Sequence, residues 1–144
     1  MVITIFFLQV PSTFSQVNNL SIIEKGTLSI KISGFDNEAG KCWFAIDNSE
    51  EVYESKDSVF IGKILPIVNR GVYLQLDSLE YGYYAIKVFH DENNNGKIDL
   101  NFIGIPTEDY GYSNNVSGWF GPSKWEKTRF LFNQSVMTIE ISVD

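Results

Sequence analysis

The sequence predicts an all-β protein, an antiparallel β-sandwich of about seven strands. Several short segments place apolar residues at every second position, and Gly, Asn, Asp or Pro residues separate these segments. Alternation at period two is typical of a strand that buries one face. No segment keeps the apolar spacing of an amphipathic helix. A length of 144 residues suits one domain with its own core.

The individual strands follow from local patterns. "GTLSIKISGF" places Leu28, Ile30 and Ile32 on one face. The other predicted strands are KCWFAI, at 41–46, and the segments 71–79, 81–91, 127–132 and 135–143. Segment 58–68 predicts two strands, or one strand broken near Pro66. "DNSEEVYES", at 47–55, fits a loop or one helical turn.

Composition limits the classes of partner. The formal net charge is -7, which argues against nucleic acid and anionic membrane surfaces, because both require clustered Lys and Arg. Cys42 is the only cysteine, so neither an intramolecular disulfide nor a multi-thiol zinc cluster is possible. Its apolar neighbours predict a buried, inert thiol. The expected partner is an unidentified ligand or protein at the cell surface or in the periplasm.

The N-terminal segment predicts export. An apolar run from Val2 to Val10 precedes small residues at 12, 13 and 15, which is typical of a signal peptide over residues 1–15. No basic residue precedes the run, so the start of this peptide is expected to be truncated. The alternative is an edge strand. The run is too short to span a bilayer, and we expect a periplasmic or secreted domain over 22–144 without a transmembrane segment.

A polar loop, "HDENNNGKIDLN", has the spacing of a calcium site. If Asp91 is position one, Asn93 and Asn95 stand at three and five, Gly96 at six, and Asp99 at nine. Calcium takes six to eight hard oxygens, and a tightly wound loop aims alternate side chains at one point. The predicted metal ligands are the side chains of these four oxygen-bearing residues and the backbone carbonyl of position seven, Lys97.

The loop departs from an EF-hand, because Phe102 stands where the bidentate glutamate would be and strands replace the flanking helices. We therefore expect calcium affinity in the range of extracellular modules, roughly 0.1 to 1 mM. The alternative is a solvated turn, since Asn, Asp and Gly favour turns for their own conformational reasons. A transition metal is disfavoured because His90 is a single nitrogen among oxygens.

The segment after this loop, "FIGIPTEDYGYSNN", is rich in Gly, Tyr and amides. Long connections of this kind are functional or pack on themselves. The residues of the two segments that would line a ligand site are His90, Asn101, Glu108, Tyr110, Tyr112, Ser113, Asn114 and Asn115. The alternative is that the tyrosines pack the segment down while the amides bond to backbone groups.

Two resemblances concern fold and family. "LDSLEYGYY" resembles the Leu-x-x-Gly-x-Tyr strand of transthyretin-like and carboxypeptidase-regulatory-like sandwiches, which implies an immunoglobulin-like or transthyretin-like fold. Residues 82–115 resemble the signature of a bacterial secreted family, domain of unknown function 2141. They match G-x-Y-A-x-x-x-x-H-D-x-N-x-N-G-x-x-D-x-N and then G-x-P-x-E-x-Y-G-[FY]-S-N-N. The resemblance implies a small exported protein and no particular activity.

Three functions fit these observations. The first is an exported, non-enzymatic binding module that carries a calcium-type loop. The second is a carbohydrate- or protein-binding accessory module without metal, in which Trp119, Phe120 and Trp125 form an aromatic platform or, alternatively, a hydrophobic latch. The third is a periplasmic hydrolase that uses His90, Asp91 and Glu108. No nucleophile elbow or metal triad is visible in the sequence, so we assign no catalytic residue.

Overall fold

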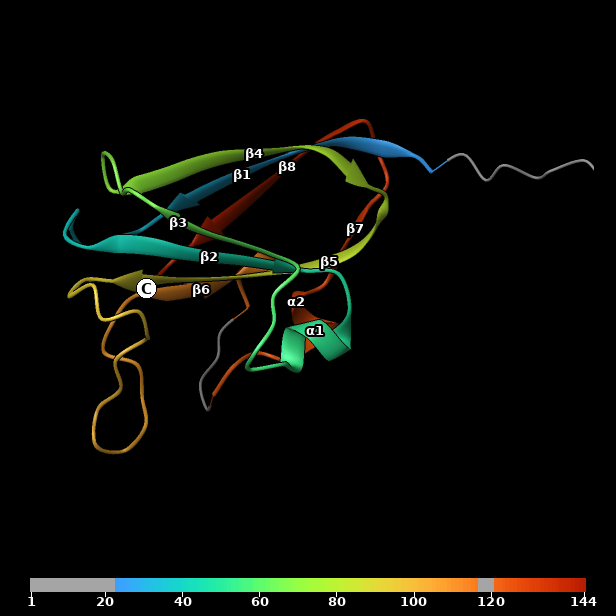
Figure 1. Cartoon of the computed structure of the whole chain (residues 1–144). Coiled ribbons are helices and arrows are strands. Elements are labelled where there is room, and N and C mark those ends of the chain that lie inside the picture. The colour runs from blue at the N-terminus through green and yellow to red at the C-terminus, as the bar shows by residue number, and fades with distance from the viewer. Residues whose placement is uncertain (1–22, 117–120) are drawn as a thin grey trace, which may run out of the picture.

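Two β-sheets pack face to face in the computed structural model, which describes residues 23–116 and 121–144 (Figure 1). The predicted signal peptide, 1–15, and two residues of the predicted platform, Trp119 and Phe120, lie outside the described residues. Within the described ranges no helix is long and apolar enough to cross a membrane.

The strands and helices are short. In chain order the strands are β1 (Lys25–Ser33), β2 (Lys41–Asp47), β3 (Ile61–Leu65), β4 (Gly71–Glu80), β5 (Gly82–Asp91), β6 (Tyr110–Tyr112), β7 (Phe130–Phe132) and β8 (Val136–Ser142). The helices are α1 (Glu50–Glu54), the 3-10 turn η1 (Ser113–Asn115) and α2 (Trp125–Thr128). Segment 47–55, predicted as a loop or one helical turn, contains helix α1. The Ser49 hydroxyl caps this helix by accepting a hydrogen bond from the Val52 N–H.

The predicted sandwich is confirmed. One sheet has the order β4-β1-β8, and the other has the order β3-β2-β5-β6, with β7 paired to the first half of β5. The described pairings are antiparallel except that of β1 with β8, which is parallel. A parallel neighbour requires a long crossover, and here the chain passes through the whole second sheet before it returns as β8.

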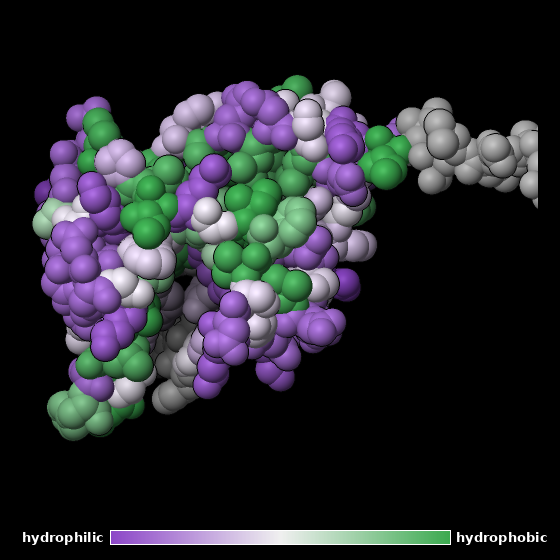
Figure 2. Space-filling view, in the orientation of Figure 1, coloured by the Kyte–Doolittle hydropathy of each residue, from purple (hydrophilic) through white to green (hydrophobic). Residues whose placement is uncertain are grey.

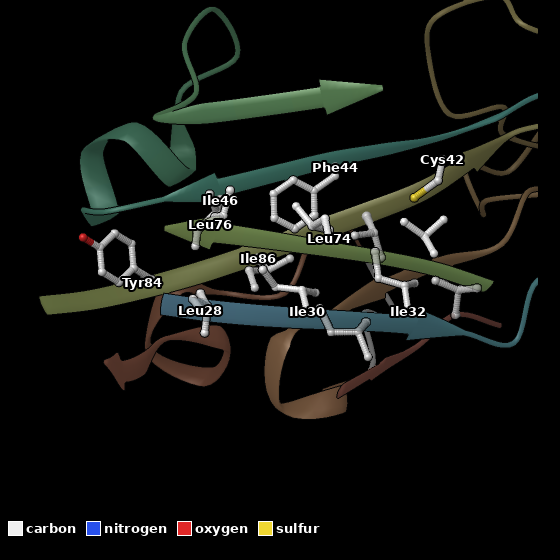
Figure 3. Close-up of a cluster of buried hydrophobic side chains, with 14 of the residues drawn as sticks. Leu28, Ile30, Ile32, Cys42, Phe44, Ile46, Leu74, Leu76, Tyr84 and Ile86 are labelled. Atoms are coloured by element: carbon white, nitrogen blue, oxygen red, sulfur yellow. The ribbon is translucent and has the colours of Figure 1, made fainter. Parts of the chain in front are cut away.

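The core lies between the two sheets and follows the period of two. Leu28, Ile30 and Ile32 of β1 point inward, as predicted, and meet Phe44, Ile46 and Ile86 of the opposite sheet (Figure 3). Cys42 belongs to this core, and burial raises the pKa of its thiol to about 12. The thiol therefore stays protonated and unreactive at neutral pH.

Segment 58–68 forms the single strand β3, which ends at Leu65 before Pro66, as the one-strand alternative predicted. One short element was not expected. β6 lies in a segment interpreted as a loop, and its three residues pair with the second half of β5. So short a strand has no period of its own, and tertiary pairing determines it.

Replacing a core isoleucine should be far more costly than replacing an outward-facing one. Ile86 is fully buried, so Ile86→Ala should lower the free energy of unfolding by about 2–5 kcal/mol, because it leaves a cavity. Ile64 faces solvent from β3, so Ile64→Ala should cost less than about 1 kcal/mol. Urea denaturation followed by circular dichroism measures both, and equal losses would contradict the described sheet faces.

Candidate functional site

Asp91 organises the beginning of the polar loop. It is the last residue of β5, and its side chain is buried. Its Oδ2 accepts hydrogen bonds from the Trp43 indole Nε1 and from the Gly96 backbone N–H, both at 2.9 Å. Its Oδ1 accepts the Asn95 backbone N–H, also at 2.9 Å. One carboxylate thus folds the loop back on itself and fixes an aromatic side chain of β2.

The alternate side chains of the loop converge on Asp99. The Nδ2 groups of Asn93 and Asn95 donate to the two carboxylate oxygens of Asp99. The amide oxygen of Asn93 accepts the Asn95 N–H, and that of Asn95 accepts the Lys97 N–H, each at 3.0 Å. Asn94 and Gly96 take positive φ angles of 58° and 81°, which the tight winding requires. The loop is therefore closed by its own hydrogen bonds.

This donor set suits a hard cation in its chemistry. Each amide oxygen accepts one N–H and has a second lone pair, and so does Oδ1 of Asp91. No three His, Cys, Asp or Glu side chains gather closely enough to hold a metal among residues 23–116 and 121–144. A cation here would therefore depend on amide and backbone oxygens, and the amide nitrogens of Asn93 and Asn95 would have to leave Asp99.

Glu108 joins this loop to the segment that follows it. Its Oε1 accepts the Glu92 N–H and its Oε2 accepts the Asp99 N–H, both at 2.9 Å, and the side chain is buried. The Thr107 N–H donates to the Asp99 carbonyl at 2.9 Å. The polar loop and the next segment consequently form one unit, held by a carboxylate that bonds only to backbone.

His90 is enclosed and does not reach solvent. Its side chain is 0% exposed, and Nε2 lies 2.6 Å from the Ala39 carbonyl oxygen. Its Nδ1 lies 3.7 Å from a carboxylate oxygen of Asp109 and 3.8 Å from one of Glu92, and Phe35 packs edge-on against the ring. The three side chains named for a hydrolase, His90, Asp91 and Glu108, are therefore all buried, and each bonds to structural groups.

The residues at the end of the second segment connect the two sheets. Ser113 is buried, accepts the Ile86 N–H at 2.9 Å and donates to the Thr128 carbonyl at 2.6 Å. The amide nitrogen of Asn114 lies within 3.1 Å of three consecutive carbonyls, those of Lys127, Thr128 and Arg129. Asn115 bonds to β8 through the Ser142 N–H and the Glu140 carbonyl. These three side chains hold backbone together.

Tyr110 belongs to a row of large apolar side chains that the sequence did not reveal, and Tyr112 lies beside it. Strand register aligns Ile64, Trp43, Phe89 and Tyr110 across β3, β2, β5 and β6, on the face away from the core. The Trp43 and Phe89 rings stack with centroids 5.7 Å apart and planes 16° apart. Burial raises the pKa of the Tyr112 phenol, which stays neutral on the same face.

This outer face is hollowed into an apolar groove of about 470 Å³. Its lining includes Trp43, Phe89, Val59 and Ile64, together with Lys63 and Lys87. Apolar side chains gather over β3, and the surface is hollowed between α1 and the loop after β5 (Figure 2). One sequence signal could have indicated this groove. "KCWFAI" and "IKVFHD" carry apolar residues on both faces, whereas a strand with one solvent-exposed face carries them on one face only.

Trp125 does not form an exposed platform. It is buried, and the centroid of its ring lies 5.8 Å from that of Tyr53. For this tryptophan the structure therefore agrees with the second alternative, a hydrophobic latch. The Tyr53 hydroxyl in turn donates to the Ser123 carbonyl at 2.6 Å. Among the described residues, the aromatic surface therefore lies on the outer face of the β3-β2-β5-β6 sheet and not at Trp125.

The chain belongs to the family described as an uncharacterised protein conserved in bacteria, domain of unknown function 2141, whose model matches residues 30–140. The matched range contains β2 to β7 whole, the second part of β1 and all but the last two residues of β8, and it includes the whole polar loop. No curated protein and no solved structure matches the chain.

Glu108→Gln should loosen the connection between the two segments. The new amide places an N–H₂ group against the backbone N–H of Glu92 or Asp99, so one buried donor loses its acceptor at about 1–3 kcal/mol. We expect a lower free energy of unfolding and faster amide exchange at residues 92 and 99. Glu54→Gln, at the exposed end of α1, is the matched control. If both variants unfold alike, the Glu108 connection contributes nothing.

Proposed function

We propose that this member of the family is a non-enzymatic binding module whose ligand lies in the groove on the outer face of the β3-β2-β5-β6 sheet. The observation that supports this proposal is the stacked Trp43–Phe89 pair on a face turned away from the core. The outer face of a sandwich is ordinarily polar, and contiguous exposed apolar surface is typical of binding sites. Export to the periplasm or beyond is part of the proposal and rests on the N-terminal sequence.

The lining favours a ligand with an apolar body. Val59, Ile64 and the two stacked rings supply apolar contacts. Lys87 is already paired with Asp47 at 2.9 Å and lies over the Tyr53 ring at 4.3 Å. Lys63 stands opposite the core residue Phe44 in the strand register, so its side chain leaves β3 on the face away from the stacked rings and brings no charge to them. A ligand with an apolar or aromatic body has the chemistry that this lining accepts.

A hydrolase is less well supported. A general acid or base must reach the substrate proton within hydrogen-bond distance. His90, Asp91 and Glu108 are enclosed, and backbone or indole groups occupy His90 Nε2 and the carboxylates, while the buried His90 Nδ1 does not reach solvent. The groove itself is lined by apolar side chains and two lysines. Binding without chemistry is consistent with both observations.

We further propose that the polar loop takes up calcium, with Asp91, Asn93, Asn95, Asp99 and the carbonyl of Lys97 as ligands. The convergence of these side chains supports it. Because Asp91 also accepts the Trp43 indole N–H, a cation in the loop would stiffen one wall of the groove. Calcium would then act on the binding face without touching the ligand.

The finer fold, a transthyretin-like or immunoglobulin-like sandwich, is likewise a proposal. Its support is the Leu79-x-x-Gly82-x-Tyr84 turn between β4 and β5. The Tyr84 hydroxyl donates to the Glu80 carbonyl at 2.8 Å. A tyrosine that bonds back to the backbone a few residues upstream is a feature of immunoglobulin-like sandwiches.

Anilinonaphthalene sulfonate, whose aromatic rings have the apolar chemistry inferred for the ligand, should bind the groove. Phe89→Ala should weaken its binding by roughly tenfold or more through lost apolar contact. Tyr73→Ala, which removes an exposed aromatic from the outer face of the other sheet, should leave the affinity unchanged. Fluorescence titration of variants with wild-type circular dichroism measures this. Equal affinity in Phe89→Ala and wild type would exclude the groove.

Calcium should raise the melting temperature. A site with Kd of roughly 0.1–1 mM, saturated at about 10 mM calcium, stabilises the fold by about 1.4–2.7 kcal/mol, or several degrees. Asp99→Asn should abolish the shift. In the presence of chelator this variant should melt close to the wild type, because the carboxylate oxygens of Asp99 bond only to two exposed amides. Asp57→Asn, an exposed acid elsewhere, should keep it. Absence of a shift in the wild type relative to chelator contradicts the calcium proposal.

A further inference from the structure

An apolar finger projects from the fold beyond the polar loop. We use this name for residues 100–105, in which Leu100, Phe102, Ile103 and Ile105 are all exposed, and Phe102 is 99% exposed. The loop that carries it, drawn in gold, extends away from both sheets (Figure 1). An isolated exposed aliphatic residue is ordinary, but four in six residues at the end of a projection form a contiguous apolar surface.

The finger is an ordered turn. The side-chain oxygen of Asn101 accepts the N–H groups of Ile103 and Ile105, each at 3.0 Å. The Asn101 N–H donates to the Ile105 carbonyl at 2.8 Å, and the Gly104 N–H donates to the Asn101 carbonyl at 2.9 Å. Leu100 and Pro106 form a bridge at its base. The apolar side chains are therefore presented on a preformed support, which reduces the entropy lost on binding.

These hydrogen bonds also determine which surroundings the finger can enter. The N–H groups of Asn101, Ile103, Gly104 and Ile105 are satisfied within the turn, and Pro106 has no N–H, whereas the N–H groups of Leu100 and Phe102 have no partner among the described residues. Hydrocarbon offers no partner to a polar group, so the finger suits the hydrated interfacial region and not the hydrocarbon core. The side-chain oxygen of Asn101 accepts two of the four internal bonds.

Charge at the base of the finger selects the type of surface. Asp99 precedes the finger, and Glu108 and Asp109 follow it, against the single cation Lys97. Anionic lipid headgroups attract clustered Lys and Arg and would repel this base. A zwitterionic headgroup imposes no such repulsion. The exposed Lys97 and half-buried Asp99 stay in contact with water and limit how deeply the finger enters.

We propose that the apolar finger inserts into the interfacial region of a zwitterionic lipid bilayer and holds the domain reversibly at a membrane surface. Four side chains on one turn give a small buried area, so attachment is weak, comparable with that of a single acyl chain, with a partition constant of about 10⁴ M⁻¹ or below. The groove takes no part in this contact, and the inference stands independently of the ligand proposed for it.

Co-sedimentation with phosphatidylcholine vesicles tests the proposal. The full chain should pellet with lipid at millimolar concentrations, and Phe102→Ser should lower the partition constant by about tenfold or more. Val136→Ser is the matched control, because Val136 is equally apolar and 65% exposed on β8. Replacing part of the phosphatidylcholine with phosphatidylglycerol at low salt should weaken binding. Loss in both serine variants alike, or no pelleting of the wild type, overturns the proposal.

A site-specific probe locates the contact. Phe102→Cys introduces an exposed thiol, while burial keeps the Cys42 thiol protonated and unlabelled. An environment-sensitive fluorophore on residue 102 should shift to shorter wavelength with phosphatidylcholine vesicles, and the same label on Val136→Cys should not. If Phe102→Ser instead abolishes concentration-dependent self-association in sedimentation velocity, with no vesicle binding by the wild type, the finger docks on a second copy and the proposal is wrong.

Discussion

The buried carboxylate of Asp91 is the constraint on which the site depends. It ends β5 with a negative charge that has almost no access to water, a situation that a protein tolerates only when hydrogen-bond donors surround the oxygens. The donors come from two places, the winding polar loop and the Trp43 indole on β2. Satisfying one charge therefore sets both the path of the loop and the orientation of an aromatic wall of the groove.

The residues after β5 have two structural roles: some side chains hold the backbone together, and others form the outer surface. Glu108 and Ser113 to Asn115 bond to backbone, so the long signature that identifies the family is largely a structural one. What the signature presents outward is different in character: the tyrosines of β6 on one side and the apolar finger on the other. Side chains with hydrogen-bonding groups maintain the shape, and apolar side chains provide the contact surface.

Period two allowed much of the fold to be predicted, because Leu28, Ile30 and Ile32 alternate with polar residues and only one register buries them. The convergence of Asn93, Asn95 and Asp99 was also predictable from spacing. The groove was not, because Trp43 and Phe89 stand among other apolar residues and the sequence does not say which neighbours face the core. That the amide of Asn114 bonds to backbone groups was the predicted alternative, but neither its partners nor those of Ser113 could be predicted, since these groups belong to residues that are distant along the chain.

The parallel pairing of β1 with β8 has a consequence for how the chain is made. β1 lies at the centre of its sheet, yet one of its two neighbours is the last strand to be synthesised. Until β8 emerges, one hydrogen-bonding edge of β1 is unpaired and the inner face of the opposite sheet is incompletely covered. Contacts of such sequence separation form slowly. The domain therefore closes only after β8 has been synthesised, and the open edge of β1 makes the incomplete chain a template for pairing with other strands until then.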